Sequence, residues 1–100
     1  MPRQPNTTSS GGPFEEETIE KVWVKGKPEV GLTFFRKDAC GASMKRDDYG
    51  KTTQFGWEID HIKPVSKAGS DDLANLQPLH WENNRHKIDD YPSWKCKKTS

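Results

Sequence analysis

A chain of 100 residues with 30% hydrophobic residues and a formal net charge of +1 has room for one small domain with a compact core. So small a net charge excludes nucleic-acid binding by overall basicity alone, and leaves only local clusters of cations for such a role. Lys and Arg gather before and after residues 57–62, but acidic residues stand among them. A solvated mixed-charge surface explains the same pattern, so charge alone does not decide the function.

The two ends of the chain differ in composition from its middle. Residues 1–13 hold Pro, Ser, Thr, Gly and Asn with almost nothing apolar, so we expect a disordered leader there. Residues 14–95 form the predicted single domain, and residues 96–100 form a basic C-terminal tail. No stretch has the pattern of a secretory signal or the length of a membrane span, so the sequence predicts a soluble cytoplasmic protein with no membrane partner.

The chain has two cysteines, Cys40 and Cys96. They could pair, but neither lies in a CxxC motif and nothing in the sequence indicates export. We therefore expect reduced thiols.

The predicted elements of the first half are short. Residues 22–24, Val-Trp-Val, favour a short strand that ends before Gly26 and Pro28. Residues 34–44 predict a helical turn or a knuckle, with Phe34 and Phe35 packed inward.

The second half has a clearer pattern. Residues 55–65 alternate well enough for a strand, residues 66–75 form a polar loop, and residues 76–79 suit a returning strand. Residues 81–89 predict a helix, in which Trp81, Asn84 and Ile88 recur at intervals of three and four. We expect that face to lie across the hairpin, so that Asn84 approaches the strand carrying Asp60.

Four polar residues stand in a fixed order within residues 57–87: Asp60, His61, Asn75 and Asn84. The sequence around them contains a DHIKP turn, an NLQ step and an NRHK segment. This order resembles the HNH (ββα-metal, or His-Me finger) endonucleases over roughly residues 36–88. The resemblance implies an α+β fold: a small ββα-metal domain with its core at about 55–90 and short additional strand or helix elements at the N-terminal side.

The resemblance also implies a division of labour. Asp60 and Asn84 would be oxygen ligands of one divalent cation, Mg²⁺ or Mn²⁺, although other divalent ions stay open. His61 would be the general base, since a histidine with an ordinary pKa of about 6.5 can be neutral at physiological pH. Asn75 would tie the loop to the hairpin and orient the ring of His61.

Further residues near the motif have two explanations each. Glu58 is either a carboxylate supporting the metal site or part of a salt bridge, and His80 either approaches the site or is a core polar residue. Phosphate contacts are expected from three cations, which could instead be solvated: Lys63, Arg85 and Lys87.

Many HNH proteins also carry a structural zinc held by two CxxC pairs. Here the corresponding positions are Cys40 with Ser43 and His80 with Asn83, of which only Cys40 and His80 are good zinc ligands. We therefore expect no structural zinc, with aromatic residues and the N-terminal strand compensating in the core.

The implied function is a metal-dependent endonuclease that nicks or cleaves DNA by a one-metal mechanism and leaves 5′-phosphate and 3′-hydroxyl ends. The expected partner is double-stranded DNA, and a homodimer or larger complex stays open. Two alternatives remain: a catalytically weak DNA-binding or structural module of the same fold, and a nuclease directed at RNA.

Overall fold

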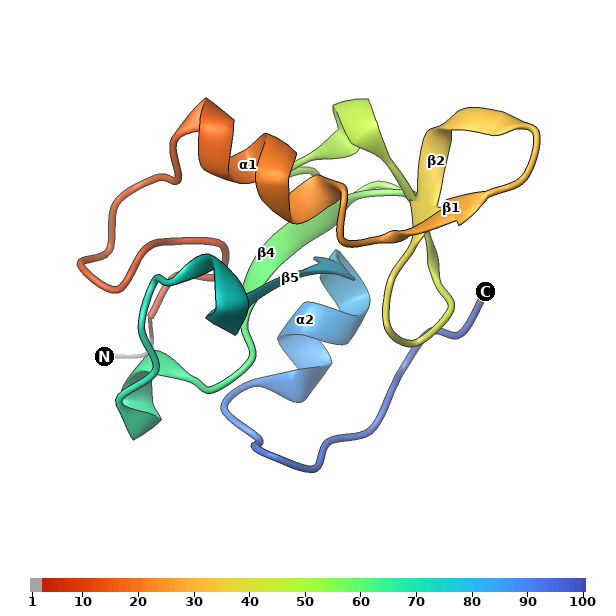
Figure 1. The fold of residues 1–100 in the computed structure, drawn as a ribbon. Coiled ribbons are helices and arrows are strands. Elements are labelled where there is room, and N and C mark those ends of the chain that lie inside the picture. Colours follow the sequence, from red (N-terminus) through yellow and green to blue (C-terminus); the bar gives the residue numbers. More distant parts are fainter. Residues whose placement is uncertain (1–2) are drawn as a thin grey trace.

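The computed structural model describes residues 3–100 as an α+β fold with two α-helices and two antiparallel sheets (Figure 1). In chain order, the elements are α1 (Glu16–Trp23), β1 (Lys27–Glu29), β2 (Leu32–Lys37), β3 (Ser43–Lys45), β4 (Trp57–His61), β5 (Leu76–His80) and α2 (Trp81–Lys87). Short 3₁₀ turns occur at Arg46–Asp48, Val65–Lys67 and Leu73–Asn75.

The centre of the fold is the β4–β5 hairpin with α2 packed against it (Figure 1). The strands pair antiparallel, with Asp60 opposite Gln77 and His61 opposite Leu76. Trp81 follows β5 directly, and its amide donates to the carbonyl of Gly56, so α2 starts beside the beginning of β4. The predicted α+β fold with a ββα core is confirmed.

The hydrophobic core lies between this hairpin and α1. The ring of Trp57 lies 5.0 Å from that of Trp23 and 4.8 Å from that of Tyr49, so three aromatic residues from separate segments meet there. Tilted and edge-on arrangements of this kind are favourable for aromatic rings and add to the burial of their area. This packing fixes β4, the strand that carries Glu58, Asp60 and His61.

The strand predicted at residues 22–24 is wrong, because α1 extends to Trp23. This helix buries Ile19, Val22 and Trp23, which stand at the three- and four-residue spacing of one helical face. Two glutamates in its first turn and a lysine in its last turn also complement the helix dipole. Burial on this face explains Ile19 and Val22, whereas Val24 follows the helix and is exposed.

Two further local predictions need correction. Residues 34–44 contain parts of β2 and β3 joined by a turn, and the Phe34 side chain is exposed at 63% instead of packed inward. On α2 the predicted apolar face is also displaced: Ile88 is 72% exposed, whereas Asn83, Asn84 and Lys87 are buried. The face of α2 that meets the hairpin is thus largely polar, and its side chains find polar partners there.

The first residues of the chain run along the hairpin. Residues 1–2 of the predicted disordered leader lie outside the described part, but residues 3–13 make defined contacts. Asn6 Oδ1 accepts hydrogen bonds from the amide of Ile59 and the hydroxyl of Tyr49. These contacts fill the edge of β4 that faces away from β5, which the composition of this segment did not predict.

The C-terminal tail is attached to the domain at two points. A disulfide joins Cys40 to Cys96, so the expectation of reduced thiols is wrong for this structure. Asn83 Oδ1 accepts from the amides of Lys97 and Lys98, and this brings the tail beside the turn that carries Cys40. The expectation of reduced thiols rested on the compartment inferred from the sequence. Two cysteines 56 residues apart form no local sequence motif that would indicate their pairing.

Neither helix in residues 3–100 combines the length and the apolar character needed to cross a membrane.

Candidate functional site

A cleft of about 460 Å³ lies between the N-terminal segment, the end of β4 and α2. Asp60, His61 and Asn84 all line it. Residues 3–7 form its opposite wall, so the segment expected to be a disordered leader is part of the cleft. The fold thus brings the predicted base and both predicted metal ligands to one cavity.

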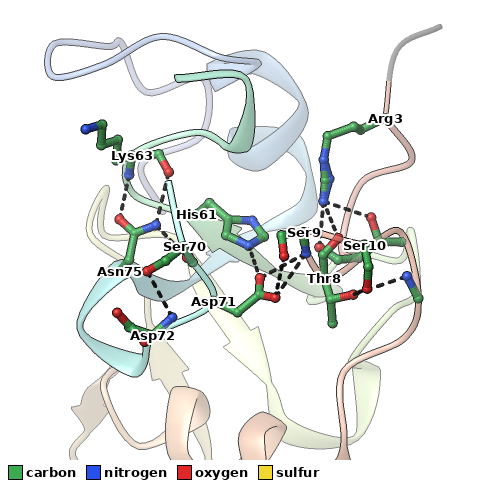
Figure 2. A network of polar contacts seen from close by, with 12 residues as sticks. Arg3, Thr8, Ser9, Ser10, His61, Lys63, Ser70, Asp71, Asp72 and Asn75 are labelled. Carbon is green, nitrogen blue, oxygen red and sulfur yellow. Dashed lines mark hydrogen bonds and ion pairs between the residues drawn. The ribbon is translucent and has the colours of Figure 1, made fainter. Parts of the chain in front are cut away.

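His61 is the last residue of β4, and its ring is held from two sides. Nε2 lies 2.7 Å from Oδ1 of Asp71 (Figure 2). The ring of Phe14 packs on the imidazole at a centroid distance of 6.0 Å. The side chain is 9% exposed. Because the contact with Asp71 uses Nε2, the other ring nitrogen, Nδ1, is the one that could accept a proton.

Asp71 is a site residue that the sequence did not predict. Figure 2 shows its carboxylate between His61 and Ser9, whose amide and hydroxyl both donate to it at 2.8–3.2 Å. Burial alone would raise the pKa of the Asp71 carboxyl, but hydrogen bonds from His61 and Ser9 outweigh it and hold this pKa below its ordinary value. Asp71 is therefore an ionised acceptor beside the imidazole at neutral pH.

Asp60 is buried and has partners from both neighbouring elements. Oδ2 accepts from Nε2 of Gln77 at 2.9 Å, and Oδ1 lies 3.3 Å from Nζ of Lys87. Burial raises the pKa of the Asp60 carboxyl, and the contacts with Gln77 and Lys87 oppose this shift only in part. Each carboxylate oxygen retains a second lone pair that these contacts do not use.

Asn84 is oriented by Glu58. Its Nδ2 donates to Oε1 of Glu58 at 2.8 Å, while Oε2 of Glu58 binds the guanidinium of Arg85 at 2.8 Å. Because the carboxylate accepts only from the amide nitrogen, the carbonyl oxygen of Asn84 is turned away from Glu58. Of the two explanations for Glu58, the salt bridge is present, and the same carboxylate orients the predicted ligand.

Asn75 connects the loop to the segment that follows β4. Its Oδ1 accepts from the amide of Lys63, and its Nδ2 donates to the carbonyls of Lys63 and Ser70 (Figure 2). Its described hydrogen bonds do not reach His61. Asn75 instead fixes Ser70, the neighbour of Asp71, so its effect on the ring passes through the loop.

Of two other candidate site residues, Lys87 lies elsewhere than expected and His80 follows one of its two explanations. Lys87 is 1% exposed, and its Nζ donates to the carbonyl of His61, so it is a buried partner of the hairpin and not a surface phosphate contact. His80 caps α2 through Nδ1 and meets the carbonyl of Gln54 through Nε2, so it is a core polar residue. Lys63 and Arg85 are at the surface, with Arg85 45% exposed.

The positions that correspond to a structural zinc are joined by a carboxylate. Asp38 accepts from the amides of Cys40 and Ala42 through Oδ1, and from His80 N and Asn83 Nδ2 through Oδ2. Asp38 therefore connects the turn after β2 to the start of α2, where the disulfide also attaches the tail.

The donors in the cleft fit a hard divalent cation. No group of three or more His, Cys, Asp or Glu able to hold a metal occurs within residues 3–100. Mg²⁺ does not need such a group, since it is commonly bound by one or two protein oxygens together with water and substrate phosphate. The Asp60 carboxylate and the turned amide oxygen of Asn84 supply that kind of set, which is also poor for zinc.

Comparison with known proteins identifies the family of this chain. No match is found among the curated proteins or the solved structures. A family model for the HNH endonucleases matches residues 40–90, which is half of the chain and includes β4, β5 and α2. The chain therefore belongs to the HNH endonuclease family, whose members are in general metal-dependent nucleases acting on nucleic acid.

Proposed function

We propose that this protein is an endonuclease that hydrolyses DNA phosphodiester bonds by a one-metal mechanism, with His61 as the general base. One observation carries the proposal: Asp60, His61 and Asn84 line the same cleft, although they come from two elements. An imidazole and two oxygen donors at one cavity are what metal-assisted hydrolysis requires.

In this mechanism Asp60 and Asn84 would hold the cation, for which we propose Mg²⁺ or Mn²⁺. When bound, the cation supplies positive charge that stabilises the negative charge developing on the phosphoryl group and on the leaving oxygen. Gln77 and Lys87 keep the Asp60 carboxylate in place, and Glu58 keeps the Asn84 amide turned.

His61 takes the proton from the attacking water. With Nε2 engaged by Asp71, Nδ1 is the ring nitrogen that accepts this proton. Attack by water on phosphorus with departure of the 3′ oxygen leaves a 5′-phosphate and a 3′-hydroxyl.

Lys63 and Arg85 are the cations we propose as phosphate contacts. Both are at the surface, and Arg85 lines the cleft, where Glu58 and the ring of Trp81, 5.6 Å away, position its guanidinium. Double-stranded DNA is the proposed substrate, since phosphate contacts position a duplex without base-specific readout.

Incubation of the protein with supercoiled plasmid tests the function. We expect nicking or cleavage with Mg²⁺ or Mn²⁺, none with EDTA, and none from His61→Ala. The matched control is His86→Ala, which removes an exposed histidine of α2 and leaves activity intact. Equal nicking by wild type and His61→Ala would overturn the role of His61.

A second assay separates the proposed substrate from RNA. Plasmid and a structured RNA are offered at equal phosphate concentration, and we expect cleavage of the plasmid alone. A preparation that binds DNA but cleaves neither substrate with any divalent metal is a binding module instead. Analytical ultracentrifugation under the assay conditions measures the oligomeric state. A cut through both strands by subunits with one site each would favour a dimer.

The cellular location is part of the proposal. A cytoplasmic protein, as the sequence predicts, keeps Cys40 and Cys96 as thiols, whereas their disulfide is typical of an oxidising compartment. Alkylation of the protein in acid-quenched cells of its host distinguishes the two states. Alkylation of both cysteines would support the cytoplasmic location, whereas alkylation of neither cysteine would contradict it.

A further inference from the structure

One carboxylate joins the N-terminal segment to the proposed base. His61 Nε2 lies 2.7 Å from Asp71, and Asp71 in turn accepts from the amide and the hydroxyl of Ser9 (Figure 2). Ser9 is 62 residues from Asp71 in the chain. The N-terminal segment and the loop that follows β4, which are distant in sequence, therefore meet beside the imidazole.

We propose that Asp71 is a positioning residue that sets the tautomer and the orientation of His61, and that Ser9 holds Asp71 for this task. The proposal rests on the proposed function, in which His61 takes a proton from water. It adds a residue of the loop and a residue of the N-terminal segment to the machinery of that step.

The chemistry of the contact gives the direction of the effect. An ionised carboxylate has acceptor sites only, so the imidazole nitrogen that faces it must carry the hydrogen. With the hydrogen on Nε2, neutral His61 has an unprotonated Nδ1, which is the form able to accept a proton. A carboxylate that fixes the tautomer of a functional histidine also restricts rotation of its ring.

The position of Asp71 depends on contacts at both of its sides. Asn75 donates to the carbonyl of Ser70 at 2.8 Å and so fixes the loop just before Asp71. On the other side, the amide of Ser9 reaches Oδ1 at 2.9 Å, and its hydroxyl reaches Oδ2 at 2.8 Å. These bonds place the carboxylate so that Oδ1 meets His61.

A hydrogen-bonded turn of the N-terminal segment holds Ser9 in place. The amide of Thr8 donates to the carbonyl of Gly12 and the amide of Gly11 to that of Thr8, which closes a turn around Ser9. Gly11 takes a φ of +91° in this turn, where a side chain would be strained. Asn6 anchors the segment to β4 on one side of this turn, and Phe14 packs on the His61 ring on the other. The segment therefore contacts the base both directly and through Asp71.

Variants of the full chain test the proposal. Asp71→Ala should lower the single-turnover cleavage rate at saturating DNA by about 10–100-fold, as loss of an orienting carboxylate does elsewhere, while the Kd for DNA stays unchanged. Asp71→Asn keeps one oxygen acceptor and should recover part of the rate. Ser9→Ala, which keeps the amide but loses the hydroxyl, should cause a smaller loss. The matched control is Asp72→Ala, which removes the neighbouring exposed carboxylate and should change nothing.

Nitrogen NMR of the imidazole provides a readout that does not depend on cleavage. Wild-type His61 should show a protonated Nε2 and an unprotonated Nδ1, and Asp71→Ala should give a mixture of tautomers with an unchanged fold. If wild type cleaves nothing, the proposed function fails, while the NMR result still decides whether Asp71 sets the tautomer. An unchanged tautomer, or a full cleavage rate in Asp71→Ala, would overturn the role of Asp71.

Discussion

The ammonium group of Lys87 lies 3.3 Å from Oδ1 of Asp60, inside the fold, and it is almost fully buried. The pair connects the last turn of α2 to the strand that carries the proposed metal ligand. Loss of one partner of a buried ion pair leaves the other without compensation.

Lys87→Met should therefore lower the free energy of unfolding by about 3 kcal/mol, because Asp60 would remain desolvated without its cation. Urea denaturation followed by tryptophan fluorescence measures the change. Lys95→Met, at an exposed lysine, is the control and should have no effect on stability. Equal stability of Lys87→Met and wild type would show that the pair is not a stabilising contact.

Metal binding should depend on Asp60 and Asn84 together. Asn84→Ala removes one oxygen donor and Asp60→Asn removes the ligand charge, so each should abolish or greatly weaken Mn²⁺ binding in calorimetric titration. Glu82→Gln, a change in the same helix outside the cleft, should bind like wild type. Undiminished Mn²⁺ affinity in Asn84→Ala would remove that residue from the ligand set.

Asn75→Ala should loosen the loop at a defined amide. The amide of Lys63 loses its acceptor, whereas the amide of Ile62 keeps the backbone carbonyl of residue 75. In hydrogen exchange, Lys63 should therefore lose protection and Ile62 should retain it. Equal exchange at Lys63 in both proteins would mean that the loop is fixed by other contacts.

Reduction should release the C-terminal tail and lower stability. A crosslink across 56 residues stabilises the folded chain by about 4 kcal/mol in the chain-entropy account. Cys96→Ser and wild type with a reductant should therefore show the same fall in Tm, and reductant should not lower the Tm of Cys96→Ser further. A Tm that does not respond to reductant would contradict a disulfide in the purified protein.

The pH dependence of stability should identify Asp71. Its pKa is lower in the folded state than in the unfolded chain, so its stabilising contribution is present above the unfolded value and is lost as pH falls through the folded value. The difference in unfolding free energy between wild type and Asp71→Asn should thus be largest near neutrality and shrink in acid.

Local sequence patterns predicted the centre of the fold well. The alternation through β4 and the short return of β5 each lie within one element, where spacing reports on geometry. The N-terminal helix was missed because the pattern Val-Trp-Val was weighed as β-type, although Ile19, Val22 and Trp23 share a helical face. Burial against another element decided between the two.

Some residues of the candidate site could be predicted from the sequence and others could not. Asp60, His61 and Asn84 could be identified from their order, and the fold places all three at one cleft. Asp71 and Ser9 could not, because their contact joins a loop to a polar segment 62 residues away and follows no period. The burial of Lys87 was equally hidden, since a lysine near a helix end is usually solvated.

The carboxylate of Asp38 has a practical consequence for experiments on this domain. It makes the junction between the turn after β2 and the start of α2 with ordinary hydrogen bonds, and the disulfide reinforces the same region. A chelator does not attack bonds of this kind. Treatment with EDTA should therefore abolish cleavage without unfolding the domain. Cleavage could then be stopped and restored by added metal in one folded sample.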